Sequence, residues 1–106
     1  MSYANNTTSS NTLHIINKSP TDHQLYQRCF NALMAGDAIL FIESAVLVCV
    51  DREFTAATTD NISYFLLEAD IQARGLKQHS DHQFHVINDD GFVDLCCQYK
   101  KTISWF

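Results

Sequence analysis

The sequence predicts a single small α/β domain, built on a mostly parallel central sheet of about five strands that is flanked by helices. Short apolar segments alternate with stretches of helical pattern along most of the chain. The segment "DAILFIE" (37–43) is continuously apolar between two acids, which is typical of a parallel strand buried on both faces. The length of 106 residues favours one domain.

The predicted domain spans residues 13–106. Residues 1–12, "MSYANNTTSSNT", are polar and of low complexity, so we expect them to form a disordered tail. Apolar and β-prone residues then recur in short runs. The expected strands are 13–17, 37–43, a strand that begins at 61 and ends before the acids at 68 and 70, 84–88 and 102–106.

Helix-forming segments separate these strands. The first is expected to start at Ser19 as its N-cap, with Pro20 in the first helical position, and to run to Ala35 before Gly36. The others are a short helix over 44–54 capped by Ser44, a helical turn over 68–76 stopped by Gly75, and a helix over 89–101 with acids in its first turn and lysines in its last.

The composition argues against several classes of function. Twelve acids against seven bases give a net charge of −5, and the bases are scattered, so direct nucleic-acid binding is not expected. No run of about 18 apolar residues is available to cross a membrane. The polar start lacks the apolar segment of a signal peptide, so we expect a cytoplasmic protein with reduced cysteines.

Cys29 is the candidate reactive residue. Helical spacing places Leu25, Cys29, Ala32 and Leu33 on one stripe that should pack on the sheet, and buried cysteine commonly acts as a small hydrophobe. A working nucleophile needs exposure and a positive field, and Cys29 lies deep in its helix rather than at the N-terminus. Packing is the favoured interpretation, and the catalytic one stays open.

The remaining cysteines and the histidines give weaker signals. Cys49 lies in an apolar run, and the vicinal Cys96 and Cys97 are expected to pack within a helix. His14 is expected to be satisfied in the core or at an interface. His79, His82 and His85 offer a metal-like spacing, but they lie in a polar loop that enters a strand, so a solvated loop is favoured over a metal site.

No known catalytic motif or phosphate-binding loop occurs, and we expect neither a cofactor nor a metal site. The chain ends in Trp105 and Phe106. These two aromatic residues are candidate interface residues if they are exposed, and core residues if they pack on the sheet.

Five segments together carry a resemblance to a known family. They are "LHIINKSP", "GDAILFIESAV", "LEADIQARGL", "DDGFVDLC" and the terminal "ISWF". In this order and at these spacings they resemble the TusB/DsrH family, which belongs to the DsrE/DsrF/DsrH-like group of small α/β domains. The family has Asp-Gly after the second strand, where this chain has Glu43-Ser44-Ala45.

The resemblance implies a subunit of a sulfur-relay complex, arranged as a dimer of heterotrimers with TusC/DsrF-like and TusD/DsrE-like sister subunits. The TusB branch delivers persulfide sulfur for 2-thiouridine at the wobble position of certain tRNAs, and the DsrH branch acts in sulfur oxidation. A TusE/DsrC-like protein receives the sulfur. DsrH-type members carry a cysteine in the first helix, roughly where Cys29 lies here, whereas the principal carrier lies on a sister subunit.

Three hypotheses follow. The chain is a mainly structural, non-catalytic subunit with Cys29 packed, or a sulfurtransferase subunit with Cys29 as an active persulfide carrier, or a stand-alone metal-binding domain that uses the His79, His82 and His85 loop. The first, in the TusB setting, is favoured, because persulfide transfer needs thiols in a reducing compartment and a scaffold needs no catalytic constellation.

Overall fold

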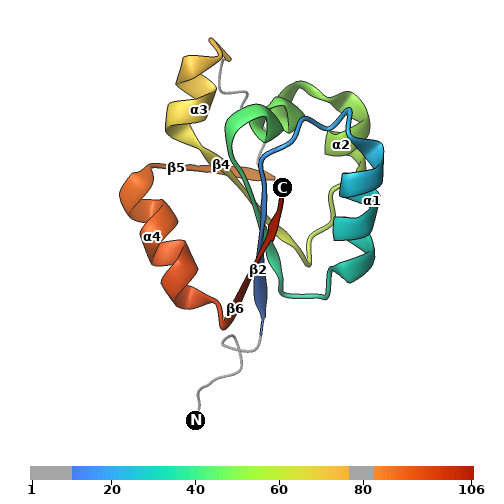
Figure 1. Cartoon of the computed structure of the whole chain (residues 1–106), viewed down its shortest axis with the longest axis vertical. Coiled ribbons are helices and arrows are strands. Elements are labelled where there is room, and N and C mark those ends of the chain that lie inside the picture. Colours follow the sequence, from blue (N-terminus) through green and yellow to red (C-terminus); the bar gives the residue numbers. More distant parts are fainter. Residues whose placement is uncertain (1–10, 77–82) are drawn as a thin grey trace.

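A five-stranded parallel sheet lies at the centre of the molecule, as the computed structural model shows (Figure 1). The structure describes residues 11–76 and 83–106. Along the sheet the strands follow the order β5-β4-β3-β2-β6, and every neighbouring pair is parallel. The strands are β2 (Thr12–Ile16), β3 (Ala38–Phe41), β4 (Ser63–Leu67), β5 (Phe84–Ile87) and β6 (Lys101–Trp105). The predicted fold class is confirmed.

Helices cover both faces of the sheet, because parallel strands need crossover connections (Figure 1). One face carries α1, η2 and α2, and the other carries α4, while α3 continues directly from the end of β4. The bounds are α1 (His23–Ala32), the 3₁₀ helix η2 (Glu43–Val50), α2 (Arg52–Ala57), α3 (Glu68–Ala73) and α4 (Asp89–Gln98).

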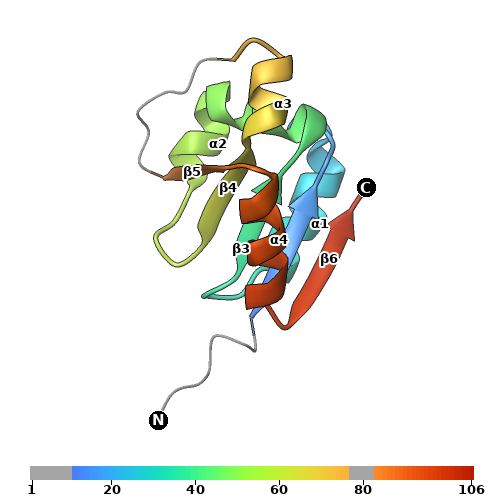
Figure 2. The ribbon, with the colours of Figure 1, turned by 90° about the vertical axis from the view of Figure 1, so that its left-hand side faces the viewer.

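The last strand returns to the first one. After β5 the chain passes along α4 and forms β6 beside β2, at the edge of the sheet (Figure 2). In this register Ile103 lies beside His14 and Trp105 beside Ile16. Since residues paired in a parallel ladder share a face, the C-terminal aromatic residue is brought against the first strand.

Two core clusters fill the layers. The larger one, on the α1 face, contains Cys29, Phe41 and Phe54, and the smaller one lies under α4 around Leu13, Leu40 and Leu95. The four residues of β3 are all fully buried. The continuous apolar run therefore forms a strand that is covered on both faces, as predicted.

The predicted bounds of the first two helices and their predicted N-caps, Ser19 and Ser44, are wrong, since η2 already begins at Glu43 with no side-chain cap. Helix α1 begins at His23 rather than after Ser19, because the Asp22 carboxylate accepts the Leu25 N–H and caps the helix, and α1 ends at Ala32. The helix expected over 44–54 is split: a 3₁₀ helix covers Glu43–Val50, and α2 starts afresh after Asp51, whose carboxylate accepts the Phe54 N–H.

The last helix also stops earlier than expected. α4 ends at Gln98, its N-cap is Asn88, and no basic residue lies in its last turn. Lys101 instead begins β6. The strand β2 begins at Thr12, inside the segment assigned to the tail, and the rest of that predicted tail, residues 1–10, lies outside the described residues.

Within Glu43-Ser44-Ala45, the segment that stands where the family has Asp-Gly, Glu43 adopts a backbone that favours glycine. Glu43 has a φ of 51°, in the left-handed region. Its backbone N–H donates to the Asp70 carboxylate at 2.7 Å, which ties the start of η2 to α3. This hydrogen bond fixes the backbone where η2 begins.

Candidate functional site

Cys29 lies in the core between α1 and the sheet. Its side chain is 0% exposed and belongs to the cluster that contains Phe41 and Phe54. The predicted stripe is confirmed for Leu25 and Cys29, whereas Ala32 is exposed.

Burial changes the chemistry of this thiol. Burial, followed by the charge of Asp37, raises the pKa of Cys29 to about 12. The thiolate is the nucleophile in persulfide exchange, so at neutral pH this thiol is almost entirely in its unreactive form. In this conformation Cys29 has the properties of a packing residue.

The other cysteines differ in exposure. Cys49 is buried in η2, Cys96 of α4 is half-buried, and Cys97 of α4 is exposed. Burial, followed by the charge of Cys97, raises the pKa of Cys96. The expectation that both members of the vicinal pair pack is therefore met for Cys96 only, because neighbours in a helix point in different directions.

Hydrogen bonds link His14 of β2, Asp37 immediately before β3 and Trp105 of β6. His14 is 1% exposed, and its Nε2 lies 3.0 Å from Oδ2 of Asp37. The Trp105 Nε1–H donates to Nδ1 of His14 at 3.0 Å, and the two rings stack at 6.2 Å. His14 is satisfied in the core, as predicted.

The hydrogen bonds fix the state of the imidazole. Trp105 can only donate, so Nδ1 of His14 must accept and Nε2 carries the proton that it donates to Asp37. Asp37 also accepts the backbone N–H groups of Thr12 and Met34, each at 3.0 Å. Burial raises the pKa of Asp37, but these hydrogen bonds together outweigh burial and hold it below its usual range.

The two terminal aromatic residues have different roles. Trp105 is half-buried and packs against the larger core, whereas Phe106 is 63% exposed. On the same edge strand Ile103 is also exposed. The core alternative thus describes Trp105, and Phe106 keeps the exposure that an interface residue needs.

The histidine-rich loop falls largely outside the described residues. His79 and His82 belong to residues 77–82, and His85 is an exposed residue of β5 whose ring lies against Phe65. Within residues 11–76 and 83–106, no group of three or more metal-ligating side chains is gathered.

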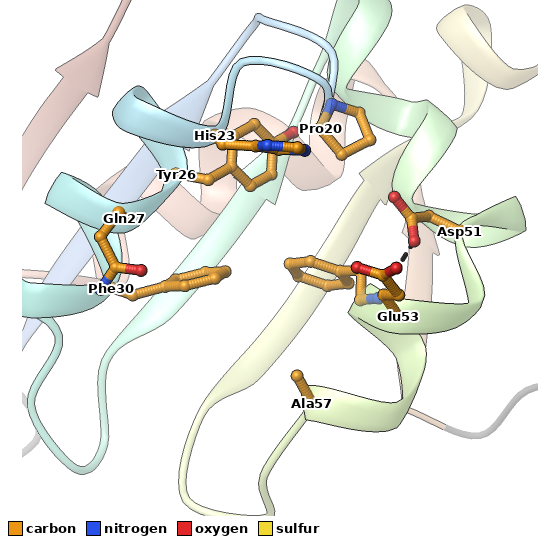
Figure 3. Close-up of a pocket in the computed structure, with 9 residues that line it drawn as sticks. Pro20, His23, Tyr26, Gln27, Phe30, Asp51, Glu53 and Ala57 are labelled. Carbon is orange, nitrogen blue, oxygen red and sulfur yellow. Dashed lines mark hydrogen bonds between the residues drawn. The ribbon is translucent and has the colours of Figure 1, made fainter.

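A groove lies between α1 and α2, with a volume of about 290 Å³. Tyr26 and Phe30 contribute its aromatic wall, and Asp51 and Glu53 contribute carboxylates from the α2 side (Figure 3). The sequence pattern did not predict this groove or the hydrogen bonds that His14 forms with Asp37 and Trp105. Each depends on contacts between segments that only the folded arrangement brings together.

Comparison with known proteins shows the class to which the chain belongs. The family model "DsrH like protein" matches residues 18–102, so the chain is a member of the DsrH-like family. The crystal structure of the ychN protein from E. coli has the same fold, with a TM-score of 0.61 at 10% identity over 90% of this chain and 98% of that one.

Two curated relatives match most of the chain and share one name. Protein TusB of Serratia proteamaculans (strain 568) is 30% identical over 95 residues, covering 88% of this chain and 99% of its own length. Protein TusB of Photorhabdus laumondii subsp. laumondii is 30% identical over 99 residues with the same coverage. These matches confirm the family resemblance. Separately, the helices in the described part of the chain are all too short or too polar to cross a membrane.

Proposed function

We propose that this chain is a subunit of a cytoplasmic sulfur-relay complex that supplies persulfide sulfur for 2-thiolation of the wobble uridine in tRNA, and that its role is mainly structural. The observation that carries the proposal is the match to Protein TusB over nearly the whole length of both chains. The net charge of −5 supports protein partners rather than direct contact with tRNA.

The properties of Cys29 support a structural role. In a persulfide transfer, an acceptor thiolate attacks the outer sulfur of a donor persulfide. A new S–S bond forms, the donor S–S bond breaks, and the donor cysteine leaves as a thiolate. A buried thiol with its pKa raised to about 12 supplies no thiolate at neutral pH. The carrier cysteine then belongs to a sister subunit.

The proposed partners are TusC/DsrF-like and TusD/DsrE-like subunits in a dimer of heterotrimers, with a TusE/DsrC-like protein as the sulfur acceptor. The edge formed by β6 and the residue that follows it is a candidate contact surface, because Ile103 of β6 and the following Phe106 are exposed. Large exposed apolar side chains at a sheet edge commonly mark an interface. Trp105 supports this surface from beneath through its bond to His14.

The alternative is a DsrH-type subunit of a sulfur-oxidation complex in which Cys29 carries persulfide. The presence of a cysteine on α1 favours it. This role requires that the α1 face open in the assembled complex, since Cys29 is 0% exposed in the isolated chain.

The test is complementation of a bacterial strain that lacks its own TusB. Wild-type chain and the Cys29→Ala variant are expressed with the cognate sister subunits, and 2-thiouridine is measured in digested tRNA by mass spectrometry. We expect both to restore the modified nucleoside. Failure of the wild type would contradict the tRNA role, and failure of the stably expressed variant alone would favour Cys29 as a carrier.

A further inference from the structure

The groove between α1 and α2 has the chemistry of a cation-binding site. Its cavity of about 290 Å³ adjoins a second of about 230 Å³, and both are lined by Phe30, Phe54 and Ala57. The first cavity lies at the lower end of the range for small-molecule pockets, so it accommodates a side chain more readily than a large cofactor. The second is lined mainly by apolar residues.

Aromatic rings form the wall of the first cavity. The rings of Tyr26 and Phe30 meet edge to face with their centroids 6.1 Å apart, and the ring centroids of Phe30 and Phe54 are 5.8 Å apart. Phe30 is only half-buried, so part of its ring is accessible from the groove. The face of an aromatic ring carries negative potential, which attracts a cation placed over it.

Two carboxylates face this wall, and the cavity lining contains neither lysine nor arginine; its basic side chain is His23, and Asp51 also accepts the Phe54 N–H. Figure 3 shows Asp51 and Glu53 on the α2 side of the cavity, opposite Gln27 and Phe30. Among residues 11–76 and 83–106 the ion pair between fully charged side chains lies elsewhere, at Asp70–Arg74, and the neutral His14 donates its hydrogen bond to Asp37 away from this groove. Arg52, which separates the two acids in sequence, is exposed and does not line the cavity.

The negative charge acts on the aromatic wall itself. The Tyr26 hydroxyl donates to the Lys18 carbonyl oxygen at 2.8 Å. Its pKa is raised above the ordinary value first by burial, and then by Cys29, Asp51 and Asp22. The negative charge of Asp51 therefore acts on groups that line the groove, and its electrostatic field would favour a cation bound there.

We propose that this groove binds an arginine side chain presented by a partner protein. The planar guanidinium group stacks over Phe30 and pairs with the carboxylate of Glu53, while the adjoining apolar cavity receives an aliphatic side chain of the same segment. Arginine fits better than lysine, because its planar fork combines ring stacking with a two-pronged hydrogen bond to a carboxylate. This inference does not depend on the sulfur-relay role.

The test uses N-acetyl-arginine-N-methylamide as a probe and its neutral citrulline analogue as the matched control. Each is titrated into the isotope-labelled full chain, and the ring and backbone resonances of Tyr26, Phe30 and Glu53 are followed by NMR. We expect saturable shifts with the arginine probe and at least fivefold weaker binding of the citrulline analogue.

Two variants localise the effect. Glu53→Gln, which removes one exposed carboxylate of the groove, is expected to weaken the arginine probe at least threefold, whereas Glu68→Gln, an exposed acid at the start of α3, leaves binding unchanged. Absence of shifts at these residues, equal binding of the citrulline analogue, or an equal effect of the two variants would each overturn the proposal.

Discussion

At the scale of single residues, the four cysteines are distinguished by burial rather than by sequence context. We expect native alkylation with iodoacetamide to modify Cys97 first and Cys96 more slowly, with Cys29 and Cys49 protected until the protein unfolds. Peptide mass spectrometry after timed labelling measures the order, and a urea-denatured sample shows that all four can react. Labelling of Cys29 as fast as Cys97 would contradict the buried position.

Asp37 is the residue with the clearest pH signature. Its folded pKa is depressed, so its contribution to stability is complete above the unfolded value of about 3.9 and is lost as the pH falls below that value through the folded pKa. The Asp37→Asn variant is expected to lower the free energy of unfolding at pH 7 by about 2–3 kcal/mol, because an amide cannot accept all the hydrogen bonds of the carboxylate.

Urea unfolding monitored by circular dichroism at several pH values between 7 and 3 measures this difference. The difference in stability between wild type and Asp37→Asn should narrow as the pH falls below about 4, because the unfolded wild-type chain then binds a proton at Asp37 that the folded protein, with its lowered pKa, does not yet bind. A gap that stays constant over the whole range would show that Asp37 does not act through its charge.

At the scale of elements, the edge strand β6 is held by one side chain and exposes another. Trp105→Phe keeps an aromatic side chain but replaces the indole with a smaller ring and removes the donor to Nδ1 of His14, and it is expected to lower the free energy of unfolding by about 1–2 kcal/mol. Phe106→Ser, at an exposed position, should change it by less than about 0.5 kcal/mol. Chemical denaturation compares the two.

The same pair of variants separates folding from assembly. If Phe106 contacts a sister subunit, Phe106→Ser reduces co-purification of the complex while the stability of the isolated chain is unchanged. Equal stability losses for the two variants, or normal assembly with Phe106→Ser, would contradict the roles assigned to them.

The elements also show which features the sequence could predict. The buried run 37–43 was readable from its hydrophobic pattern, because burial on both faces imposes it. The split between η2 and α2 could not be predicted, since an apolar run such as "SAVLVCV" has no periodicity. Ser44 and Asp51 are both residues that can cap a helix, and the sequence does not show that α2 begins after Asp51.

The candidate site was less predictable for a physical reason. That Cys29 faces the sheet follows from helical spacing, and the structure confirms it. The bond between Trp105 and His14 joins residues 91 positions apart, and it exists only because β6 pairs with β2 rather than with β5. Strand order of this kind is a tertiary property, and the periodicity of a single sequence does not contain it.

At the scale of the whole molecule, the central claim is that this chain is a structural subunit of a sulfur-relay complex in which another chain carries the sulfur. The most direct measurement is the intact mass of every subunit after co-expression with both sister chains and incubation of the purified complex with cysteine and a cysteine desulfurase. The account predicts that a sister chain gains a sulfur atom and that this chain does not. A sulfur atom gained by this chain, and lost in a Cys29→Ser variant, would contradict it.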